Sequence, residues 1–268
     1  MDVEKHNLAQ IERLNQRGGR TLSVLDLMED GTLTAEMAAF CWCCVEAGDS
    51  FLTGAVPGGV GKTTLMATLL GFLPPGDRIV TVSRRGVIEQ GLRGEVEQPA
   101  TFLAHEIGSG SWFGYIWGAD AAAFFRLTAQ DFRCASCLHA DTPQQTRDQL
   151  LPLGVRAEDL ARVPLLLYMV AERSGMRLRR RVAALSYLVD GERTALYRWQ
   201  REDDRFQAQL PRERIAELLA GRLSLDAERA DHTWRHREEL LTQWHEEGIR
   251  RFEQVRARVV TSYGREEA

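Results

Sequence analysis

One short stretch constrains the fold of this chain more than any other feature. It reads Gly54-Ala-Val-Pro-Gly-Gly-Val-Gly-Lys-Thr-Thr64, with the apolar run Phe51-Leu-Thr53 before it and the helical pattern Thr64-Leu-Met-Ala-Thr-Leu-Leu70 after it. A strand, a glycine-rich loop, Gly-Lys-Thr and a helix follow one another in phosphate-binding loops. The glycines let backbone N–H groups approach a phosphate, and the helix presents the positive end of its dipole. The stretch therefore predicts a nucleotide site in an α/β domain.

Consecutive residues of this loop are the predicted contacts of ATP and Mg²⁺. We expect Lys62 to neutralise the β- and γ-phosphates and the hydroxyl of Thr63 to bind Mg²⁺. The strict motif begins with glycine, whereas this chain has Val56 there. An ordinary glycine turn before a helix is the alternative. The whole predicted nucleotide site consists of Pro57, Gly58, Gly59, Val60, Gly61, Lys62, Thr63 and Thr64.

Composition and charge narrow the class of protein. The 268 residues can form one large domain, or one domain with a small appendage, and 44% are hydrophobic, as in an ordinary globular protein. A net charge of −4 gives no general reason to expect nucleic-acid binding. No apolar run has the length of a membrane span, and the N-terminus is charged rather than signal-like. We therefore expect a cytoplasmic protein that reaches the inner face of a membrane only through partners.

The five cysteines do not predict a disulfide framework, because the count is odd and no secretion signal is present. Cys134-Ala-Ser-Cys137 has the spacing of a metal-binding pair. However, the segment is apolar and no second pair accompanies it. We therefore predict buried cysteines on a strand rather than a zinc site.

Strand-like and helix-like segments alternate along the chain, which predicts a mostly parallel sheet with helices on both faces. Residues 101–107 fit either a strand or a short helix. The Asp190-Gly191 turn predicts an antiparallel hairpin after the parallel strands. The predicted strands beyond the first are Arg78–Ser83, Trp112–Trp117, Arg133–His139 and Val163–Val170, and the predicted helices before it are Leu22–Met28 and Thr34–Glu46, with Thr34 as an N-cap.

Composition divides the chain into three parts. Residues 1–20 are polar and contain the flexible Arg17-Gly-Gly-Arg20, so we expect a leader or linker. Residues 21–210 carry the α/β pattern. Residues 211–268 read as charged amphipathic helices with a break near Gly248, which predicts an α-helical appendage packed on the core. Their mixed charges argue against a helix lying on a membrane surface.

Several segments of the chain together resemble one known family. They are similar to segments of the secretion ATPase superfamily, the motors of type II and type IV secretion, type IV pili and the archaellum. Phe-Leu-Pro-Pro after the phosphate loop is far more specific than Gly-Lys-Thr alone, and Leu-His-Ala is similar to the family's His box. The segments are Thr21–Thr34, Phe51–Thr81, Cys137–Pro143 and, similar to the C-terminal helices of archaeal members, Arg235–Tyr263.

The resemblance implies a RecA-like P-loop NTPase core that assembles into hexameric rings and binds ATP between subunits. It implies a membrane platform protein as partner, through which ring closure drives filament assembly or secretion. It also implies that His139 senses the γ-phosphate or couples ring motion, although a histidine at a strand end is otherwise an ordinary structural residue. Family members usually carry a separate N-terminal domain, for which this chain is too short, so association with a complete motor paralogue is the alternative to a homo-hexamer.

Two acidic positions of the family differ in this chain. The family's acidic box follows the second strand, where this chain has Ser83-Arg84. The best match to the Walker B strand is Tyr115-Ile-Trp-Gly-Ala119, which places alanine at the acid. The neighbouring Asp120 is therefore the candidate catalytic acid, with a helix N-cap as its alternative role. Glu89 and Glu106 are further substitutes that no position in the motif supports.

Three functions are compatible with these residues. The first is an ATP-hydrolysing component of an archaeal-type type II/IV secretion or pilus assembly system, and the second is a hydrolysis-deficient nucleotide-binding paralogue with a regulatory or structural role. A partition or signalling ATPase is a third, which Phe-Leu-Pro-Pro and Leu-His-Ala disfavour. Sequence does not select an arginine finger among Arg84, Arg85, Arg126 and Arg147.

Overall fold

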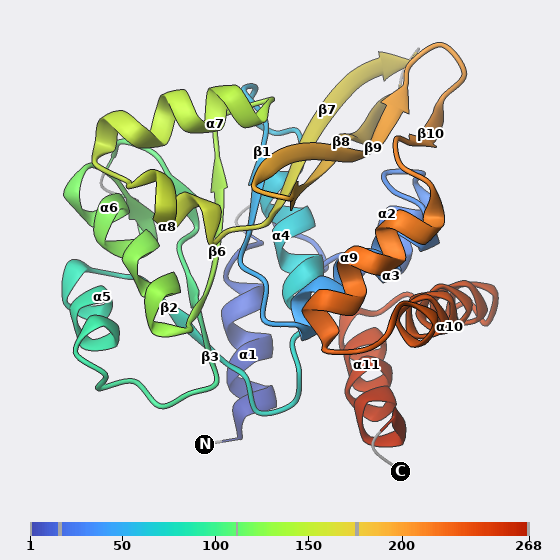
Figure 1. Cartoon of the computed structure of the whole chain (residues 1–268), viewed down its shortest axis with the longest axis horizontal. Coiled ribbons are helices and arrows are strands. Elements are labelled where there is room, and N and C mark those ends of the chain that lie inside the picture. The colour runs from blue at the N-terminus through green and yellow to red at the C-terminus, as the bar shows by residue number, and fades with distance from the viewer. Residues whose placement is uncertain (1, 16–17, 111, 175–176, 267–268) are drawn as a thin grey trace.

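The computed structural model describes residues 2–15, 18–110, 112–174 and 177–266. One sheet runs through it in the order β10-β9-β8-β7-β1-β6-β3-β2, with β4 and β5 beside this path (Figure 1). The central strand β1 (Phe51–Gly54) pairs in parallel with β6 and β7, and the parallel pairing continues from β6 through β3 to β2. This confirms the predicted α/β class and its mostly parallel sheet. The other parallel strands are β2 (Arg78–Thr81), β3 (Ala100–Leu103), β6 (Arg133–Leu138) and β7 (Leu165–Ser174).

The sheet ends in an antiparallel section, as the Asp190-Gly191 turn predicts. Strand β8 (Arg177–Val189) pairs antiparallel with β7 and β9 (Glu192–Gln200), and β9 pairs with β10 (Arg205–Ala208). Asp190 and Gly191 both have positive φ, at 50° and 83°, which suits a tight hairpin turn. The antiparallel strands therefore extend the sheet on the β7 side of β1.

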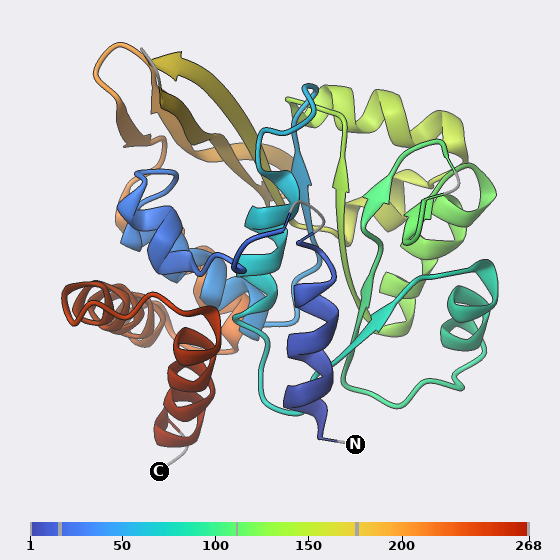
Figure 2. The ribbon, with the colours of Figure 1, turned by 180° about the vertical axis from the view of Figure 1, so that it is seen from behind.

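Helices cover both faces of the sheet, and each face has its own buried cluster (Figures 1 and 2). Neighbouring residues of β1 divide between the clusters, with Phe51 in one and Leu52 in the other, because successive side chains of a strand point to opposite faces. The helices are α1 (Val3–Glu12), α2 (Val24–Glu29), α3 (Ala35–Glu46), α4 (Lys62–Leu70), α5 (Arg85–Leu92), α6 (Ala119–Arg126), α7 (Pro143–Leu150), α8 (Ala157–Ala161), α9 (Arg212–Leu223), α10 (Ala227–Glu246) and α11 (Phe252–Glu266), with short 3₁₀ turns at Leu127–Gln130 and Leu151–Leu153. Among the helices of the described residues, none has the length and apolar content needed to cross a bilayer.

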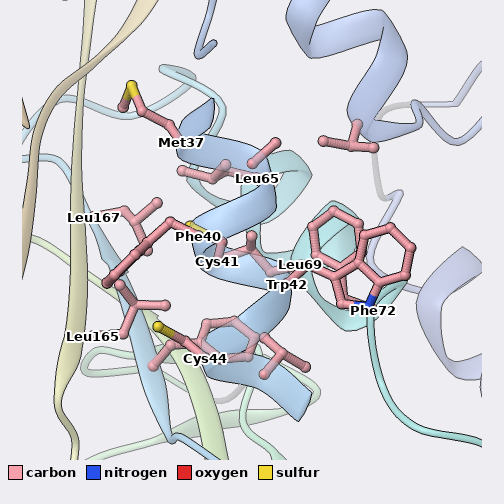
Figure 3. Close-up of a cluster of buried hydrophobic side chains, with 14 of the residues drawn as sticks. Met37, Phe40, Cys41, Trp42, Cys44, Leu65, Leu69, Phe72, Leu165 and Leu167 are labelled. Carbon is pink, nitrogen blue, oxygen red and sulfur yellow. The ribbon is translucent and has the colours of Figure 1, made fainter. Parts of the chain in front are cut away.

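Helix α3 holds the phosphate-loop helix α4 in place. It is apolar on nearly all sides and buried from Met37 to Val45, as expected of a helix that is hydrophobic all round. Its side chains lie against α4 and β7, where Leu65 and Leu167 belong to the same cluster (Figure 3). The predicted cap at its start is confirmed, because the Thr34 side chain accepts a hydrogen bond from the Met37 N–H at 3.2 Å.

Both ends of the chain pack on the core. In α1, the Asn7 side chain donates to the Asp77 carbonyl at 2.7 Å and accepts from the Ile79 N–H at 2.9 Å, which attaches the helix to β2. At the other end, Trp234 of α10 is fully buried and donates to the Glu36 carbonyl at 3.0 Å. The expected break near Gly248 is confirmed, since α10 ends at Glu246 and α11 begins at Phe252. The boundaries at residues 20 and 211 stay predictions.

The prediction of a buried strand over residues 112–117 is wrong. Trp112 is 73% exposed, Phe113 52% and Trp117 44%. Only Tyr115–Ile116 forms a strand (β5), and it pairs with the short β4 (Glu106–Ile107). An apolar run alone does not distinguish a core strand from a loop, and here the positive-φ glycine at 114 interrupts the run while those at 110 and 118 flank it. Of the two alternatives for residues 101–107, the structure has strands, with β3 ending at Leu103 and β4 at Ile107.

The prediction of buried strand cysteines is confirmed. Cys134 and Cys137 lie on β6 and are fully buried. Burial raises the pKa of the Cys137 thiol to about 12. Within the described residues, no group of three or more His, Cys, Asp and Glu side chains is arranged to hold a metal ion.

Candidate phosphate-binding site

The loop between β1 and α4 presents unpaired backbone N–H groups. Gly59 and Gly61 have φ of 81° and 111°, the left-handed region that glycine tolerates best. The Thr53 hydroxyl donates to the Lys62 carbonyl at 3.1 Å and so ties the strand to the start of α4. No acidic residue lies in the first turn of α4. Among the described residues, no backbone acceptor takes the N–H groups of Gly58, Gly59, Gly61, Lys62 and Thr63, so an anion fits this loop.

The first glycine of the stretch is required by packing rather than by φ. A Cβ placed on Gly54 would lie 2.4 Å from the Ala140 carbonyl oxygen and 2.8 Å from the Tyr168 ring. Gly54 therefore lets β1 approach the loop after β6, which carries His139 and Asp141.

Gly54→Ala is expected to destabilise the fold by about 1–3 kcal/mol, because backbone and a buried ring must shift to admit the methyl group. The matched control is Gly58→Ala in the same loop, where a Cβ meets nothing within 4 Å. Urea unfolding of both variants measures the difference. Equal unfolding free energies for the two variants would contradict the close approach at Gly54.

Lys62 lies inside the loop rather than on the surface. Its side chain is 6% exposed, and its ammonium donates to the Ala55 carbonyl at 3.1 Å. The same nitrogen lies 3.8 Å from Glu106 Oε1 and 3.3 Å from His139 Nδ1. A buried ammonium needs a nearby opposite charge, which Glu106 supplies. Lys62 is therefore not a surface lysine.

Glu106 places a carboxylate beside the Lys62 ammonium. It begins β4, which continues β3 along β6, so it stands at the same edge of the sheet as the loop. Its buried carboxylate also contacts His139 Nε2, and Oε2 accepts a hydrogen bond from the Tyr115 hydroxyl at 3.2 Å. The sequence motif does not point to Glu106, because the best match to the Walker B strand falls on residues 115–119. In the sheet, β3 and not β5 lies between β6 and β2.

His139 connects Glu106 to the start of the loop. It follows β6, and Nδ1 lies 2.8 Å from the Val56 carbonyl oxygen, to which it donates. The nearby Lys62 ammonium therefore contacts Nδ1 without donating to it. Lys62 and His139 lie at one site, because the ends of parallel strands β1 and β6 share one edge of the sheet.

Val56 explains how the loop dispenses with the motif's first glycine. It is not among the described residues with positive φ, so its backbone does not require glycine. Its N–H donates to Asp141 Oδ1 at 2.8 Å, while its carbonyl accepts from His139. The Val56 side chain is 49% exposed, so the surface accommodates it at the place of the motif's glycine. The segment after β6 thus holds the loop start through both polar groups of one residue.

Asp120 lies in a different setting from the one expected of a catalytic acid. It is in the first turn of α6, with its side chain 37% exposed and paired at 2.9 Å with Arg85 of α5. None of the contacts described for Asp120 is with Lys62 or Glu106. Arg85 also pairs with Glu89 at 2.8 Å, so Glu89 faces the surface as well. The family's acidic box position, at Ser83 and Arg84, supplies no carboxylate.

Thr63 occupies the second position of α4 and is half-buried. Its hydroxyl lies 3.9 Å from the Cys137 sulfur, beneath the loop. The hydroxyl of Thr63 and the carboxylate of Glu106 are oxygen donors of the type that Mg²⁺ prefers. Thr63 therefore stays our predicted Mg²⁺ ligand, with the phosphate oxygens of the nucleotide completing the set.

His105, beside Glu106, is a buried histidine without hydrogen-bond partners in the described part of the chain. Its ring packs edge-to-face on Phe113 with centroids 5.3 Å apart. Burial, with a smaller effect of the Arg13 charge, lowers the pKa of His105 from 6.5 to about 4. The folded protein therefore holds this ring neutral at pH values where the unfolded chain protonates it.

The lowered pKa of His105 makes the free energy of unfolding fall as the pH falls. The contribution of neutral His105 is fully present above pH 6.5, and it is lost as the pH falls toward 4, because the unfolded state then binds the extra proton. The loss is expected to reach about 3 kcal/mol. His105→Phe should flatten the fall in unfolding free energy between pH 6.5 and 4, as measured by urea unfolding at several pH values. An unchanged slope would show that His105 does not cause it.

No protein-family model matches this chain, and neither does any curated protein. Among solved structures, the ATPase DotB of Yersinia pseudotuberculosis is similar, with a TM-score of 0.43 and 12% identity over 77% of this chain and 62% of that chain. The VirB11 ATPase of the Brucella suis type IV secretion system, in complex with sulphate, has a TM-score of 0.43 and 15% identity over 67% and 61%. DotB of Legionella pneumophila has a TM-score of 0.34 and 14% identity over 82% and 62%.

The chain therefore spans less than two thirds of the length of each of these ATPases. All three of these similar structures are of ATPases.

Proposed function

We propose that this protein binds ATP with Mg²⁺ at the loop between β1 and α4 and hydrolyses it. One observation carries the proposal: a buried ammonium, Lys62, lies in a loop of unpaired N–H groups beside the carboxylate of Glu106. Free amides and a lysine bind phosphate oxygens. A carboxylate at the same place orients or deprotonates the attacking water. We therefore propose that Glu106, rather than Asp120, supplies the catalytic carboxylate.

Each residue has a distinct part in this proposal. Lys62 neutralises charge on the β- and γ-phosphates, and the Thr63 hydroxyl binds Mg²⁺. Glu106 accepts the proton of the attacking water. His139, held between Glu106 and the Val56 carbonyl, positions the Glu106 carboxylate. Through the same two contacts, it couples loss of the γ-phosphate to the start of the loop at Val56. Bound Mg²⁺ would supply charge neutralisation at the transferred phosphoryl group.

We further propose that the chain works in an archaeal-type type II/IV secretion, pilus or archaellum assembly system. The support is the sequence resemblance, above all Phe72-Leu-Pro-Pro75 after the loop helix and Leu138-His-Ala140 after β6. The protein would act as a homo-hexamer or with a complete motor paralogue, at the cytoplasmic face of a membrane platform protein. An arginine from a neighbouring subunit would complete the site.

A hydrolysis-deficient paralogue is the second candidate, because the edge beyond β2 has Ser83 and Arg84 where the family has acids. Equilibrium ATP binding and steady-state phosphate release, measured on the same preparation, separate the two. Turnover that Lys62→Ala abolishes supports the hydrolase. Tight binding without turnover supports the paralogue, and absence of binding overturns both.

A further inference from the structure

A second cation lies beside the phosphate loop, on a strand that the sequence motif does not include. A Cβ placed on Gly61 would lie 3.4 Å from Cδ and 3.8 Å from Nε of Arg180. Gly61 is the N-cap of α4 and directly precedes Lys62. The half-buried Arg180 side chain of β8 therefore runs along the loop at the point where the helix begins.

Arg180 differs from the arginines on either side of it. Arg181 pairs with Asp204 at 2.8 Å, and Arg179 lies 3.4 Å from the same carboxylate. Alternation along β8 directs Arg180 to the opposite side. In the described part of the chain, no carboxylate pairs with Arg180 and its guanidinium donates no hydrogen bond.

Arg180 and Glu106 flank the loop from opposite sides. The neighbours of β1 are β6 on one side and β7 on the other. Glu106 stands beside β6, whereas Arg180 is on β8, which pairs with β7 at Ala171. Lys62, the expected partner of the terminal phosphates, leans toward Glu106, so a nucleotide bound here would have its terminal phosphate on that side. Its phosphates nearer the ribose would then lie on the Arg180 side.

We propose that Arg180 is a phosphate-binding residue of this site, acting within its own subunit on the phosphates that ATP and ADP share. A planar guanidinium can hold two phosphate oxygens at once, which an ammonium cannot. The inference rests on the proposed nucleotide site. In this proposal, Arg180 raises the affinity for ATP and ADP but does not act in the chemical step, whereas an arginine finger does.

The test compares ATP and ADP binding by calorimetry for the wild-type chain, Arg180→Gln and Arg180→Lys. Glutamine keeps part of the stem packed on Gly61 but removes the charge. Arg180→Gln should weaken binding of both nucleotides by about 10–100-fold, and by the same factor. Arg180→Lys keeps the charge and should lose less affinity for both nucleotides than Arg180→Gln. Arg198→Gln, an exposed arginine of β9, is the matched control and should bind normally.

Two results would overturn the inference while leaving the nucleotide site intact. One is wild-type affinity in Arg180→Gln when Lys62→Ala has lost binding. The other is weakened binding of ATP but not of ADP, which would move Arg180 to the terminal phosphate. If Arg180→Gln does not melt cooperatively, Arg180→Lys decides: ATP and ADP affinities equal to wild type would overturn the inference. A wild-type chain that binds neither nucleotide would overturn the proposed function and this inference together.

Discussion

Lys62→Ala is expected to weaken ATP binding by about 100-fold, or roughly 3 kcal/mol, because it removes a buried cation that donates to the phosphates. The loop has no other ammonium, since Lys5 is the chain's only other lysine and lies exposed on α1. Phosphate release should fall below detection in the same variant. Calorimetric titration with Mg·ATP measures the affinity.

Lys5→Ala is the matched control and should bind ATP as the wild type does. Thermal melting of both variants separates lost binding from lost folding, because Lys62 is buried beside Glu106 whereas Lys5 is not. Wild-type affinity in a folded Lys62→Ala variant would contradict the placement of phosphate at this loop.

Glu106→Gln is expected to lower ATP turnover by about 10²–10⁴-fold while leaving ATP affinity within a few-fold of wild type. Glutamine has the shape of glutamate and can still accept a hydrogen bond from the Tyr115 hydroxyl, but it cannot take a proton from water at neutral pH. Single-turnover hydrolysis with pre-bound ATP measures the chemical step directly.

Asp120→Asn is the matched control for this acid. Its carboxylate pairs with Arg85 at the surface, so the variant should keep its turnover within about twofold, as surface substitutions usually do. The reverse pattern, with a rate lost in Asp120→Asn and kept in Glu106→Gln, would return the catalytic role to Asp120 and contradict the assignment to Glu106.

The part of the site that lies on β1 and β6 was predictable from sequence. Lys62 follows an apolar strand in a recognisable loop, and His139 follows another apolar strand. Parallel strands end at one edge, so the two residues had to meet. What sequence did not show is that His139 and Asp141 hold Val56 by its backbone, because backbone groups leave no trace in residue identity.

The sequence analysis does not select Glu106 as the candidate catalytic acid, and the reason is physical. The apolar run around Trp112 has the composition of a core strand, and it directed the Walker B match away from Glu106. Only the pairing of β3 and β4 with β6 places Glu106 beside Lys62. Similarly, three consecutive arginines are equivalent in sequence, and the register of β8 alone decides that Arg180 faces the loop.

For the helical ends of the chain, the sequence likewise predicted local structure but not tertiary contacts. The amphipathic patterns predicted helices after residue 211 and their break near Gly248. They did not show that Trp234 would enter the cluster around α3. Nor did the polar character of residues 1–20 reveal α1, whose Asn7 side chain bonds to the backbone of β2. Hydrogen bonds between a side chain and a distant backbone depend on tertiary structure that local patterns do not encode.

The most direct test of the proposed hydrolase is phosphate release from Mg·ATP by the purified wild-type chain, with bound ATP measured on the same sample. Repeated turnover that Glu106→Gln removes without loss of binding is the predicted result. ATP that binds tightly and is recovered unhydrolysed would contradict it.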